Sequence, residues 1–412
     1  MVGSRIPFCS KWRHSQSEQW PLVLDGWRVR IPALSGFVLR HHGGHMNRPD
    51  ERTSVTIVTG FLGSGKTTLL NRALRSPILA TAAVIINEFG SVPLDHLLTE
   101  ASDDQMVVLD NGCLCCTVFG DLIATLNRLY HAREAGDTPP FDRVIIETSG
   151  LADPRPVVQA FLSDPTLEGL YRLDSVLTVL DAVNGPDTLQ RHSEAVHQVA
   201  LAERILITKL DLLGVDLAGL RESELRRHLR RLNPVAEIYR NGEPGLDPVE
   251  LLVNGGFSLR RDSLDALTWL NSAMYELDGE SRSQPTFLVH PHEQTVTSFC
   301  FRREQPTTLD ALELLLAAIE RNLGTSLLRL KGLVHVRERP GQPAVIHGAQ
   351  HLLHNMTWLD RWPDADHSTR IVFITDGIAR ADLEDMVGLL DRVAQRTALT
   401  RERAQWGAAL AQ

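Results

Sequence analysis

Short apolar segments rich in β-branched residues alternate with amphipathic stretches along most of the chain before Phe257. Unbroken apolar runs of this kind are typical of strands buried on both faces of a parallel sheet. The predicted strands are Val55–Thr59, Ala82–Ile86, Met106–Leu109, Arg143–Ile146, Ser175–Leu180 and Arg204–Ile207. Because helix-like stretches separate several of them, the pattern predicts an α/β domain with a mostly parallel sheet and helices on both faces.

The pattern changes after Phe257, where strands mixed with fewer helices indicate a second, smaller α+β domain. The predicted strands there are Thr295–Phe301, Gly332–Arg337 and Arg370–Thr375, and the predicted helices are Leu309–Asn322 and Ala381–Leu410. The last helix has apolar residues at helical spacing, so we expect it to dock on this second domain.

These patterns divide the chain of 412 residues into four parts. We expect an N-terminal extension over 1–52, the α/β domain over 53–258, a polar linker over 259–284, and the α+β domain with its terminal helix over 285–412. Residues 1–52 show no clear amphipathic period, and Met46 precedes a polar lead-in to the first strand. We therefore expect this extension to be disordered or to reflect a mis-assigned start, with an organelle transit peptide as the alternative.

Charge and cysteine content narrow the class of protein. The formal net charge of −9 and the pI near 6.0 give no large basic field, so we expect no nucleic-acid partner. The sequence has no apolar run of about 18 residues, so we expect no membrane span. Three of the five cysteines fall within four positions, which makes a poor disulfide framework and indicates a reducing, cytoplasmic location.

Residues 60–68 carry the sequence GFLGSGKTT between the first predicted strand and a helix-like stretch. This is the phosphate-binding pattern in which glycines let backbone N–H groups surround phosphates, a lysine reaches the terminal ones and a hydroxyl binds Mg²⁺. The strand before it and the helix after it are the context that this motif requires. The predicted nucleotide-binding residues here are Gly60, Gly63, Ser64, Gly65, Lys66, Thr67 and Thr68, with Thr67 as the Mg²⁺ ligand.

The predicted strand Arg143–Ile146 is followed by Glu147 and, after two polar residues, by Gly150. An acid at such a position lies near Mg²⁺ or the attacking water in phosphate-cleaving enzymes, and the glycine N–H contacts the γ-phosphate. We predict these roles for Glu147 and Gly150; a strand that simply ends in a solvated acid is the alternative.

A third nucleotide motif follows the last strand of the α/β domain, at Thr208-Lys209-Leu210-Asp211. An aspartate two residues after a lysine can accept hydrogen bonds from guanine N1–H and N2–H₂, while the lysine stem packs along the base. The motif therefore favours GTP over ATP. GTPases usually have asparagine at its first position, so Thr208 departs from the pattern.

Cys113, Cys115 and Cys116 form the sequence Cys-x-Cys-Cys just before a helix-like stretch that starts at Thr117. Thiolates are soft ligands suited to Zn²⁺ and neighbouring transition metals, and a helix N-terminus lowers thiol pKa values. Three protein ligands leave a fourth tetrahedral position open, which suits a transferable ion. A redox-active pair and buried structural thiols are the alternatives.

Taken together, these motifs resemble the CobW family of P-loop GTPases, related to HypB and UreG, whose members act as metal chaperones or insertion factors. The resemblance rests on the three nucleotide motifs, the cysteines, Asn87–Gly90, Leu151–Pro154 and, in the second domain, Leu328–Gly332 and Arg370–Ile374. It implies that Asn87–Asp95 is a switch segment and that the cysteines bind zinc, or cobalt or iron. It also implies that GTP hydrolysis drives metal release to a client metalloprotein.

The chain departs from many relatives in two places. Ser91 stands where they carry an acid after Phe-Gly, and Pro93 replaces a more flexible position. Only His290 and His292 stand where many relatives carry a histidine-rich segment, so we do not expect high-capacity metal storage.

These features predict a metal-responsive GTPase that converts GTP to GDP and phosphate, with Lys66 and Glu147 as catalytic residues and a client metalloprotein as partner; a homodimer is left open. Two alternatives remain at this stage. A non-catalytic metal buffer or sensor would use the cysteines alone, and a P-loop kinase acting on a small metabolite would use the nucleotide site alone.

Overall fold

This computed structural model describes residues 22–24, 27–29, 52–86, 106–108, 117–138, 140–253, 295–349, 352–353 and 356–410. The chain divides into two compact units, Met1–Met46 and Asn47–Gln412. In the first unit, β1 (Leu22–Leu24) and β2 (Trp27–Val29) pair as antiparallel strands. The predicted linker, residues 259–284, lies outside the described residues, so the domain boundaries stay a prediction.

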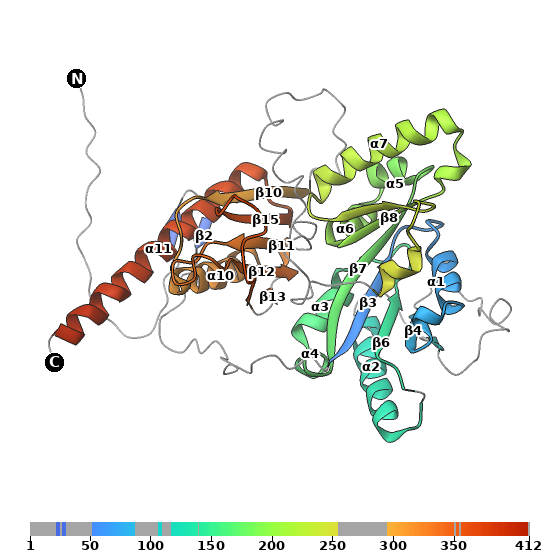
Figure 1. Cartoon of the computed structure of the whole chain (residues 1–412), viewed down its shortest axis with the longest axis horizontal. Coiled ribbons are helices and arrows are strands. Elements are labelled where there is room, and N and C mark those ends of the chain that lie inside the picture. Colours follow the sequence, from blue (N-terminus) through green and yellow to red (C-terminus); the bar gives the residue numbers. More distant parts are fainter. Residues whose placement is uncertain are drawn as a thin grey trace. The chain divides into compact units, whose positions relative to one another are not determined.

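A seven-stranded, fully parallel sheet forms the centre of the α/β domain, in the order β5-β4-β6-β3-β7-β8-β9 (Figure 1). Its strands are β3 (Thr53–Thr59), β4 (Ala82–Ile86), β5 (Met106–Val108), β6 (Arg143–Glu147), β7 (Tyr171–Asp181), β8 (Arg204–Thr208) and β9 (Glu237–Arg240). The continuous apolar runs of the sequence become strands buried on both faces, as the α/β prediction requires.

Helices cover both faces of this sheet because successive strand residues point in opposite directions. Residues of α2 (Thr117–Ala135), α3 (Arg155–Ser163) and α4 (Pro165–Leu170) pack on Val55 and Ile57. Helix α1 (Lys66–Leu74) and the 3-10 helix η5 (Pro248–Leu252) pack on the opposite side. The other elements that the structure describes in this domain are η1 (Pro77–Leu79), α5 (Gly185–Arg191), α6 (Ser193–Leu201), η4 (Leu210–Leu212) and α7 (Val215–Leu232).

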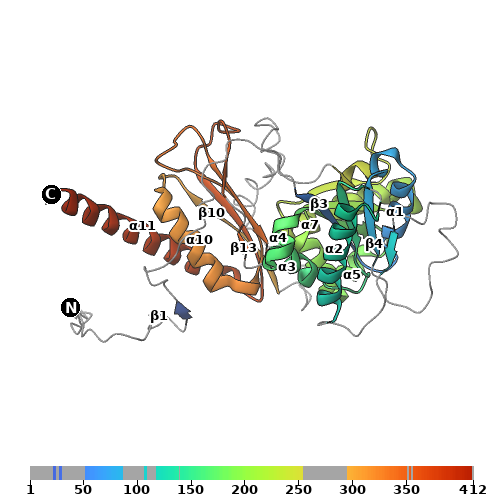
Figure 2. The ribbon, with the colours of Figure 1, turned by 90° about the horizontal axis from the view of Figure 1, so that it is seen from below.

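The second domain contains a six-stranded antiparallel sheet in the order β10-β15-β11-β12-β13, with β14 paired to β12. Its strands are β10 (Val296–Arg303), β11 (Leu327–Val334), β12 (Ala344–Ala349), β13 (Leu352–Leu353), β14 (Thr357–Trp358) and β15 (Thr369–Asp376). The helices are α10 (Leu309–Leu323), the short η7 (Gly324–Ser326) and α11 (Arg380–Leu410). Helices α10 and α11 pack on each other along this sheet (Figure 2), and the predicted α+β class is confirmed.

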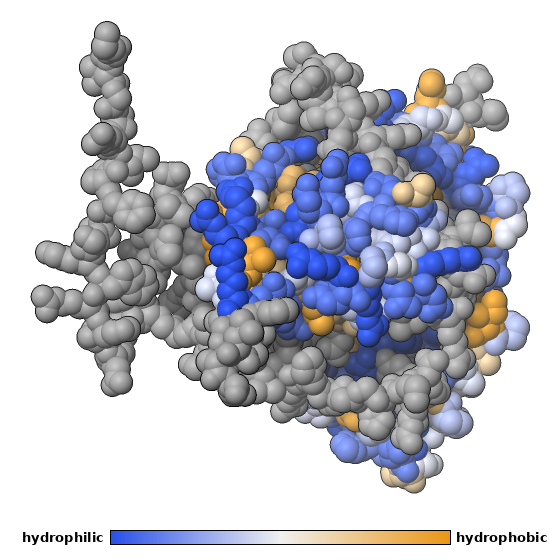
Figure 3. Space-filling view, turned by 60° about the vertical axis from the view of Figure 1, so that its left-hand side comes forward, coloured by the Kyte–Doolittle hydropathy of each residue, from blue (hydrophilic) through white to orange (hydrophobic). Residues whose placement is uncertain are grey.

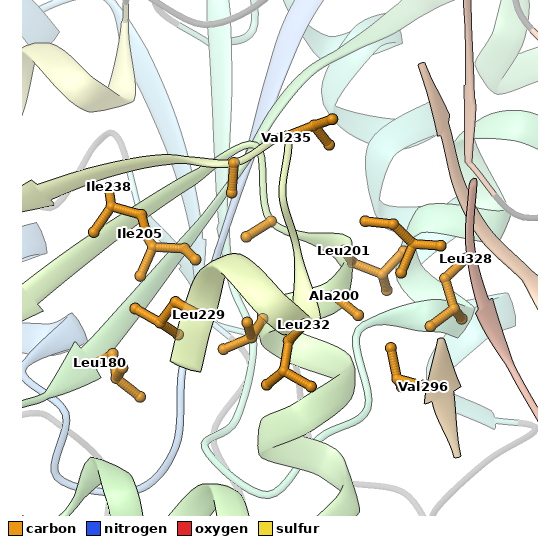
Figure 4. Close-up of a cluster of buried hydrophobic side chains, with 14 of the residues drawn as sticks. Leu180, Ala200, Leu201, Ile205, Leu229, Leu232, Val235, Ile238, Val296 and Leu328 are labelled. Atoms are coloured by element: carbon orange, nitrogen blue, oxygen red, sulfur yellow. The ribbon is translucent and has the colours of Figure 1, made fainter. Parts of the chain in front are cut away.

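The two domains share one apolar core within the second compact unit. In Figure 4, Val296 of β10 and Leu328 of β11 lie beside Ala200 and Leu201 of α6, with Leu232 of α7 nearby. Apolar contact of this kind fixes a domain pair more firmly than a polar surface does. Helices α6 and α7 of the α/β domain therefore both pack on the C-terminal sheet.

Strand β11 corrects the sequence prediction, which placed a strand at Gly332–Arg337. The strand instead begins at Leu327 and ends at Val334. Its charged residues Arg329 and Lys331 are only 5% and 3% exposed, because this strand faces the α/β domain and not solvent. Because charged residues are usually exposed, Arg329 and Lys331 do not indicate a buried strand in the sequence.

The face shown in Figure 3 is mainly hydrophilic where the structure describes it, with apolar side chains scattered singly or in small groups. None of the helices that the structure describes is both long enough and apolar enough to cross a membrane.

Candidate nucleotide-binding site

The loop between β3 and α1 has the backbone geometry of a phosphate-binding loop. Gly60, Gly63 and Gly65 adopt φ values of 140°, 72° and 105°, which side chains rarely allow. A Cβ at Gly60 would lie 2.2 Å from the carbonyl oxygen of Val179, so this position also needs glycine for space. The loop therefore turns tightly at the carboxyl end of β3 and directs the start of α1 toward the same edge of the sheet.

Lys66, the first residue of α1, folds back over this loop. Its ammonium group donates to the carbonyl oxygens of Gly60 at 2.7 Å and Phe61 at 3.3 Å. Lys66 is 7% exposed, so its positive charge is held at the loop that the sequence predicts for phosphate. Ser64, also in the loop, has a buried hydroxyl with no hydrogen-bond partner among the described residues.

Thr67 and Glu147 bring a hydroxyl and a carboxylate together beside the loop. The Thr67 hydroxyl donates to Oε1 of Glu147 at 3.3 Å, although the two residues come from α1 and β6. Strands β3 and β6 are parallel neighbours, with Val58 opposite Glu147, which explains why the acid lies next to the loop. A hydroxyl and a carboxylate are oxygen ligands of the kind that Mg²⁺ prefers, so these residues fit a magnesium-bound nucleotide.

The predicted base-reading motif is tied directly to the phosphate loop. The Thr208 hydroxyl donates to the carbonyl oxygen of Ser64 at 2.7 Å, with a longer contact to Leu180 O at 3.3 Å. Thr208 thus fixes the end of β8 against the loop, although it departs from the usual asparagine. Asp211 follows on the 3-10 turn η4, three residues later in the chain, and is itself exposed.

Lys209 adopts φ 61°, in the left-handed region that is uncommon for residues other than glycine. This turn brings its ammonium group 2.7 Å from Oδ2 of Asp181 at the end of β7. Burial alone would raise the pKa of Asp181, but hydrogen bonds from Lys209 and Asn184 hold that pKa below its ordinary value. Asp181 is therefore a fixed negative charge that orients Lys209.

Gly150 lies against the phosphate loop on its other side. A Cβ here would come within 2.6 Å of the backbone nitrogen of Leu62, so only glycine allows this approach. The Gly150 carbonyl accepts a hydrogen bond from Gln198 Nε2 at 3.2 Å, and Ala152 O accepts from the same group at 3.1 Å. The segment after β6 is thus held between the phosphate loop and α6.

Comparisons with known proteins agree with this geometry. Residues 54–240 match the family model described as CobW/HypB/UreG, nucleotide-binding domain, and residues 296–389 match the cobalamin synthesis protein CobW C-terminal domain. The chain is 30% identical to the zinc chaperone YjiA of Escherichia coli over 322 residues, which cover 78% of this chain and 93% of that protein. The chain belongs to the CobW family.

One further protein and a crystal structure of YjiA extend this comparison of the CobW-family chain. It is 32% identical over 249 residues to the zinc-regulated GTPase metalloprotein activator 1 of Schizosaccharomyces pombe, and the match covers 58% of this chain and 57% of that protein. The crystal structure of Zn(II)-bound YjiA GTPase from E. coli superposes with a TM-score of 0.58 at 27% identity, covering 84% of this chain and 99% of that one. The P-loop GTPase fold and the separate C-terminal domain are therefore confirmed.

The residues predicted to bind metal are separate from this nucleotide site in the sequence. Cys113, Cys115, Cys116 and the switch segment Asn87–Asp95 fall outside the described residues, as do His290 and His292. Helix α2 does begin at Thr117, where the sequence predicts a helix directly after the cysteines. Among the residues that the structure describes, no group of three or more histidine, cysteine or acidic side chains is arranged to hold a metal ion.

Two residues of this site, Asp181 and Gln198, were not predicted from the sequence. Asp181 had a visible signal, since it is an acid at the end of a buried apolar strand, in the same position relative to β7 as Glu147 relative to β6. The sequence signal for Gln198 was weaker, because it is only a polar residue within the apolar helix α6. Both became recognisable as site residues only once the fold placed Asp181 against Lys209 and Gln198 against Gly150.

Proposed function

We propose that this protein is a GTP-hydrolysing metal chaperone or insertase, which couples its nucleotide state to Zn²⁺ binding and to delivery of that ion to a client metalloprotein. The observation that carries the proposal is the grouping of Lys66, Thr67 and Glu147 at one loop. The base-reading motif is bonded to that same loop through Thr208. Support also comes from the relatives, which are named as zinc chaperone and zinc-regulated GTPase metalloprotein activator.

In this proposal, loop N–H groups hold the phosphates of GTP and Lys66 offsets the charge that develops as the γ-phosphate is transferred. A water molecule attacks the γ-phosphorus, the bond to the β–γ bridging oxygen breaks, and GDP and inorganic phosphate leave. Glu147 orients that water. Thr67, with the Glu147 carboxylate beside it, would hold a Mg²⁺ ion, which would neutralise part of the phosphate charge.

The choice of base in this proposal rests on Asp211, whose carboxylate accepts from guanine N1–H and N2–H₂. Lys209 packs along the base from its position beside Asp181. Adenine lacks that pair of donors, so GTP is preferred over ATP.

The cargo in this proposal is Zn²⁺, with cobalt or iron as second choices, bound by Cys113, Cys115 and Cys116. The cysteines precede α2 in the chain and follow the proposed switch segment Asn87–Asp95. Because binding free energies are linked, any effect of GTP on zinc affinity must equal the effect of zinc on GTP affinity. Three closely spaced thiolates need a reducing compartment, so we place the protein in the cytoplasm.

Calorimetric titration of Zn²⁺ into the full chain tests this coupling, once with a non-hydrolysable GTP analogue and once with GDP. We expect zinc affinities that differ by about 5-fold or more, the usual lower range of allosteric coupling. Equal affinities in both states would contradict the coupling. As matched controls, Lys66→Ala should remove the nucleotide dependence while zinc still binds, and Cys115→Ser should weaken zinc binding while GTP still binds.

Two outcomes would instead favour the alternatives. Zinc binding without measurable phosphate release from GTP, unaffected by Lys66→Ala, would indicate a metal buffer or sensor. Phosphoryl transfer to a small metabolite with ATP preferred over GTP would indicate a kinase.

A further inference from the structure

A closed cluster of four charged or polar side chains joins the segment after β6 to the C-terminal sheet. Arg155 donates to Asp376 Oδ2 at 2.9 Å and to Asp153 Oδ2 at 2.6 Å. His197 places Nε2 3.1 Å from Asp376 Oδ2 and Nδ1 3.4 Å from Asp153 Oδ2. Each carboxylate therefore contacts both Arg155 and His197, and Asp376 is the member that the C-terminal domain supplies.

The cluster is partly buried. The side chains of His197 and Asp376 are 8% and 21% exposed, and those of Asp153 and Arg155 are 26% and 30% exposed. Burial alone would raise the pKa of Asp153, but hydrogen bonds from His197 and Arg155 hold that pKa at about 2. Asp153 is therefore ionised at neutral pH, and an ion pair in these surroundings is screened by salt much less than one at the surface.

The same helix connects this cluster to the nucleotide loop. Gln198, the residue after His197 in α6, is 1% exposed and donates to the carbonyl oxygens of Gly150 and Ala152. Its own carbonyl accepts from the Thr178 hydroxyl at 2.6 Å, which anchors this part of α6 to strand β7. Within residues 148–155, Gln198 therefore holds Gly150 and Ala152, and the cluster holds Asp153 and Arg155.

On the other side, Asp376 is held by the C-terminal sheet. It ends β15, where it pairs with Val296 of β10, and the N–H of Gly377 donates to Thr295 O at 2.6 Å. Val296 in turn packs in the apolar core around Leu201 of α6 (Figure 4). A displacement of Asp376 is therefore a displacement of the C-terminal sheet relative to α6.

We propose that Asp376 is a positioning residue for the nucleotide site, which acts through Arg155 and His197 on residues 148–155. The segment has one arrangement when Gly150 contacts the γ-phosphate of GTP and another with GDP, and Asp376 stabilises one of them. The C-terminal domain thereby sets the preference between GTP and GDP, and by reciprocity the nucleotide sets how firmly that domain is held. This inference rests on the proposed function, because it needs a γ-phosphate contact at Gly150.

A purely structural role for the cluster predicts something different. Ion pairs that only fasten two domains contribute equally in both nucleotide states, so their loss lowers stability and leaves the ratio of the two affinities unchanged. The ratio of GTP-analogue affinity to GDP affinity is therefore the decisive measurement.

The test is Asp376→Asn in the full chain, which keeps the shape of the side chain and removes its charge. Binding of a non-hydrolysable GTP analogue and of GDP is measured by calorimetry. We expect the affinity ratio to change by about 5-fold or more from that of the unaltered protein. Asp376→Glu, which restores the charge, should bring the ratio back toward that of the unaltered protein.

Glu203→Gln is the matched control, because Glu203 pairs with Arg329 of β11 at the same domain contact but outside the cluster. It should lower the melting temperature and leave the affinity ratio unchanged. If Asp376→Asn also leaves the ratio unchanged, or if both variants shift it equally, the proposal is wrong. If the unaltered protein binds neither nucleotide, the proposed function is wrong and this inference falls with it. If the unaltered protein binds both nucleotides but Asp376→Asn leaves the affinity ratio unchanged, only this inference is wrong.

Hydrogen exchange of backbone amides in the unaltered protein is a second test, which needs no variant and so does not depend on whether Asp376→Asn folds. In the unaltered protein, amides of residues 148–155 and of the strand end around Asp376 should change protection together between the GTP-analogue and GDP states. A change confined to residues 148–155, with no change around Asp376, would contradict the proposal.

Discussion

The phosphate loop and the polar cluster of Arg155, His197 and Asp376 at the contact between the two domains are encoded in the sequence in opposite ways. The loop is made by residues close together in the chain, with glycine conformations that the local sequence dictates. The domain contact joins Arg155 to Asp376, 221 positions apart, and His197 to Asp376, 179 apart. Substitutions in the loop should therefore affect folding and binding outright, whereas those at the contact should act through stability or through the difference between nucleotide states.

The largest effect at the loop should come from Gly60→Ala. The new Cβ would lie 2.2 Å from Val179 O, and φ of 140° is unfavourable for alanine. We expect the free energy of unfolding to fall by about 3–4 kcal/mol, with loss of GTP binding, because neither backbone can move without disturbing the sheet. Chemical denaturation and nucleotide titration measure both effects.

Gly63→Ala is the matched control for that prediction. Gly63 also has positive φ, 72°, but a Cβ there would meet nothing within 4 Å. Only the conformational cost of about 1 kcal/mol should remain. If the two variants lose equal stability, the close approach to Val179 is not what requires Gly60.

The same contrast explains what the sequence could predict. The parallel strands are continuous apolar runs and the loop is a local motif with its strand and helix beside it, so both follow from neighbouring residues. Strand β11 was placed too late in the chain because Arg329 and Lys331 look like exposed residues, and only the packing of two domains buries them. The short edge strand β9 has four residues and gave no periodic signal.

The cluster around Asp376 could not be predicted for a related reason. Asp153 was noted only as part of a family motif, and nothing near it in sequence indicates a partner in the second domain. Asp376 follows the predicted strand Arg370–Thr375, and an acid at such a position is most often solvated. Its role depends on how the two sheets meet at α6, which no local pattern specifies.

At the domain contact, Glu203→Gln should have an intermediate effect on stability. Glu203 forms a close ion pair with Arg329, which also donates to Leu201 O at 2.7 Å. Removing the carboxylate charge leaves a buried guanidinium less well compensated, and we expect a loss of about 2 kcal/mol. The melting temperature of each variant measures it.

The pH dependence of this loss has a definite sign. Burial alone would raise the pKa of Glu203, but Arg329 and Lys331 hold it at about 2, below the ordinary 4.5. A carboxyl group whose pKa is lowered by folding stabilises the protein above its unfolded pKa, and this contribution is lost as pH falls through the folded value. The gap in melting temperature between the unaltered protein and Glu203→Gln should therefore be smaller at pH 4 than at pH 5.5. A gap that widens on acidification would contradict this assignment.

The smallest expected effect returns to the loop, at Thr208→Val. The substitution keeps the shape of the side chain but removes the donor to Ser64 O, a bond of 2.7 Å between the base-reading motif and the phosphate loop. Loss of one such hydrogen bond costs about 1 kcal/mol, so GTP affinity should fall roughly 5-fold if Thr208 positions the motif. Thr208→Ser keeps the hydroxyl and should bind GTP almost as tightly as the unaltered protein. Competition between GTP and ITP, which lacks the guanine amino group, tests whether Asp211 has moved. If only Thr208→Val shows a reduced preference for GTP over ITP, base selection depends on this hydrogen bond. If Thr208→Val and Thr208→Ser behave alike, Thr208 contributes only packing.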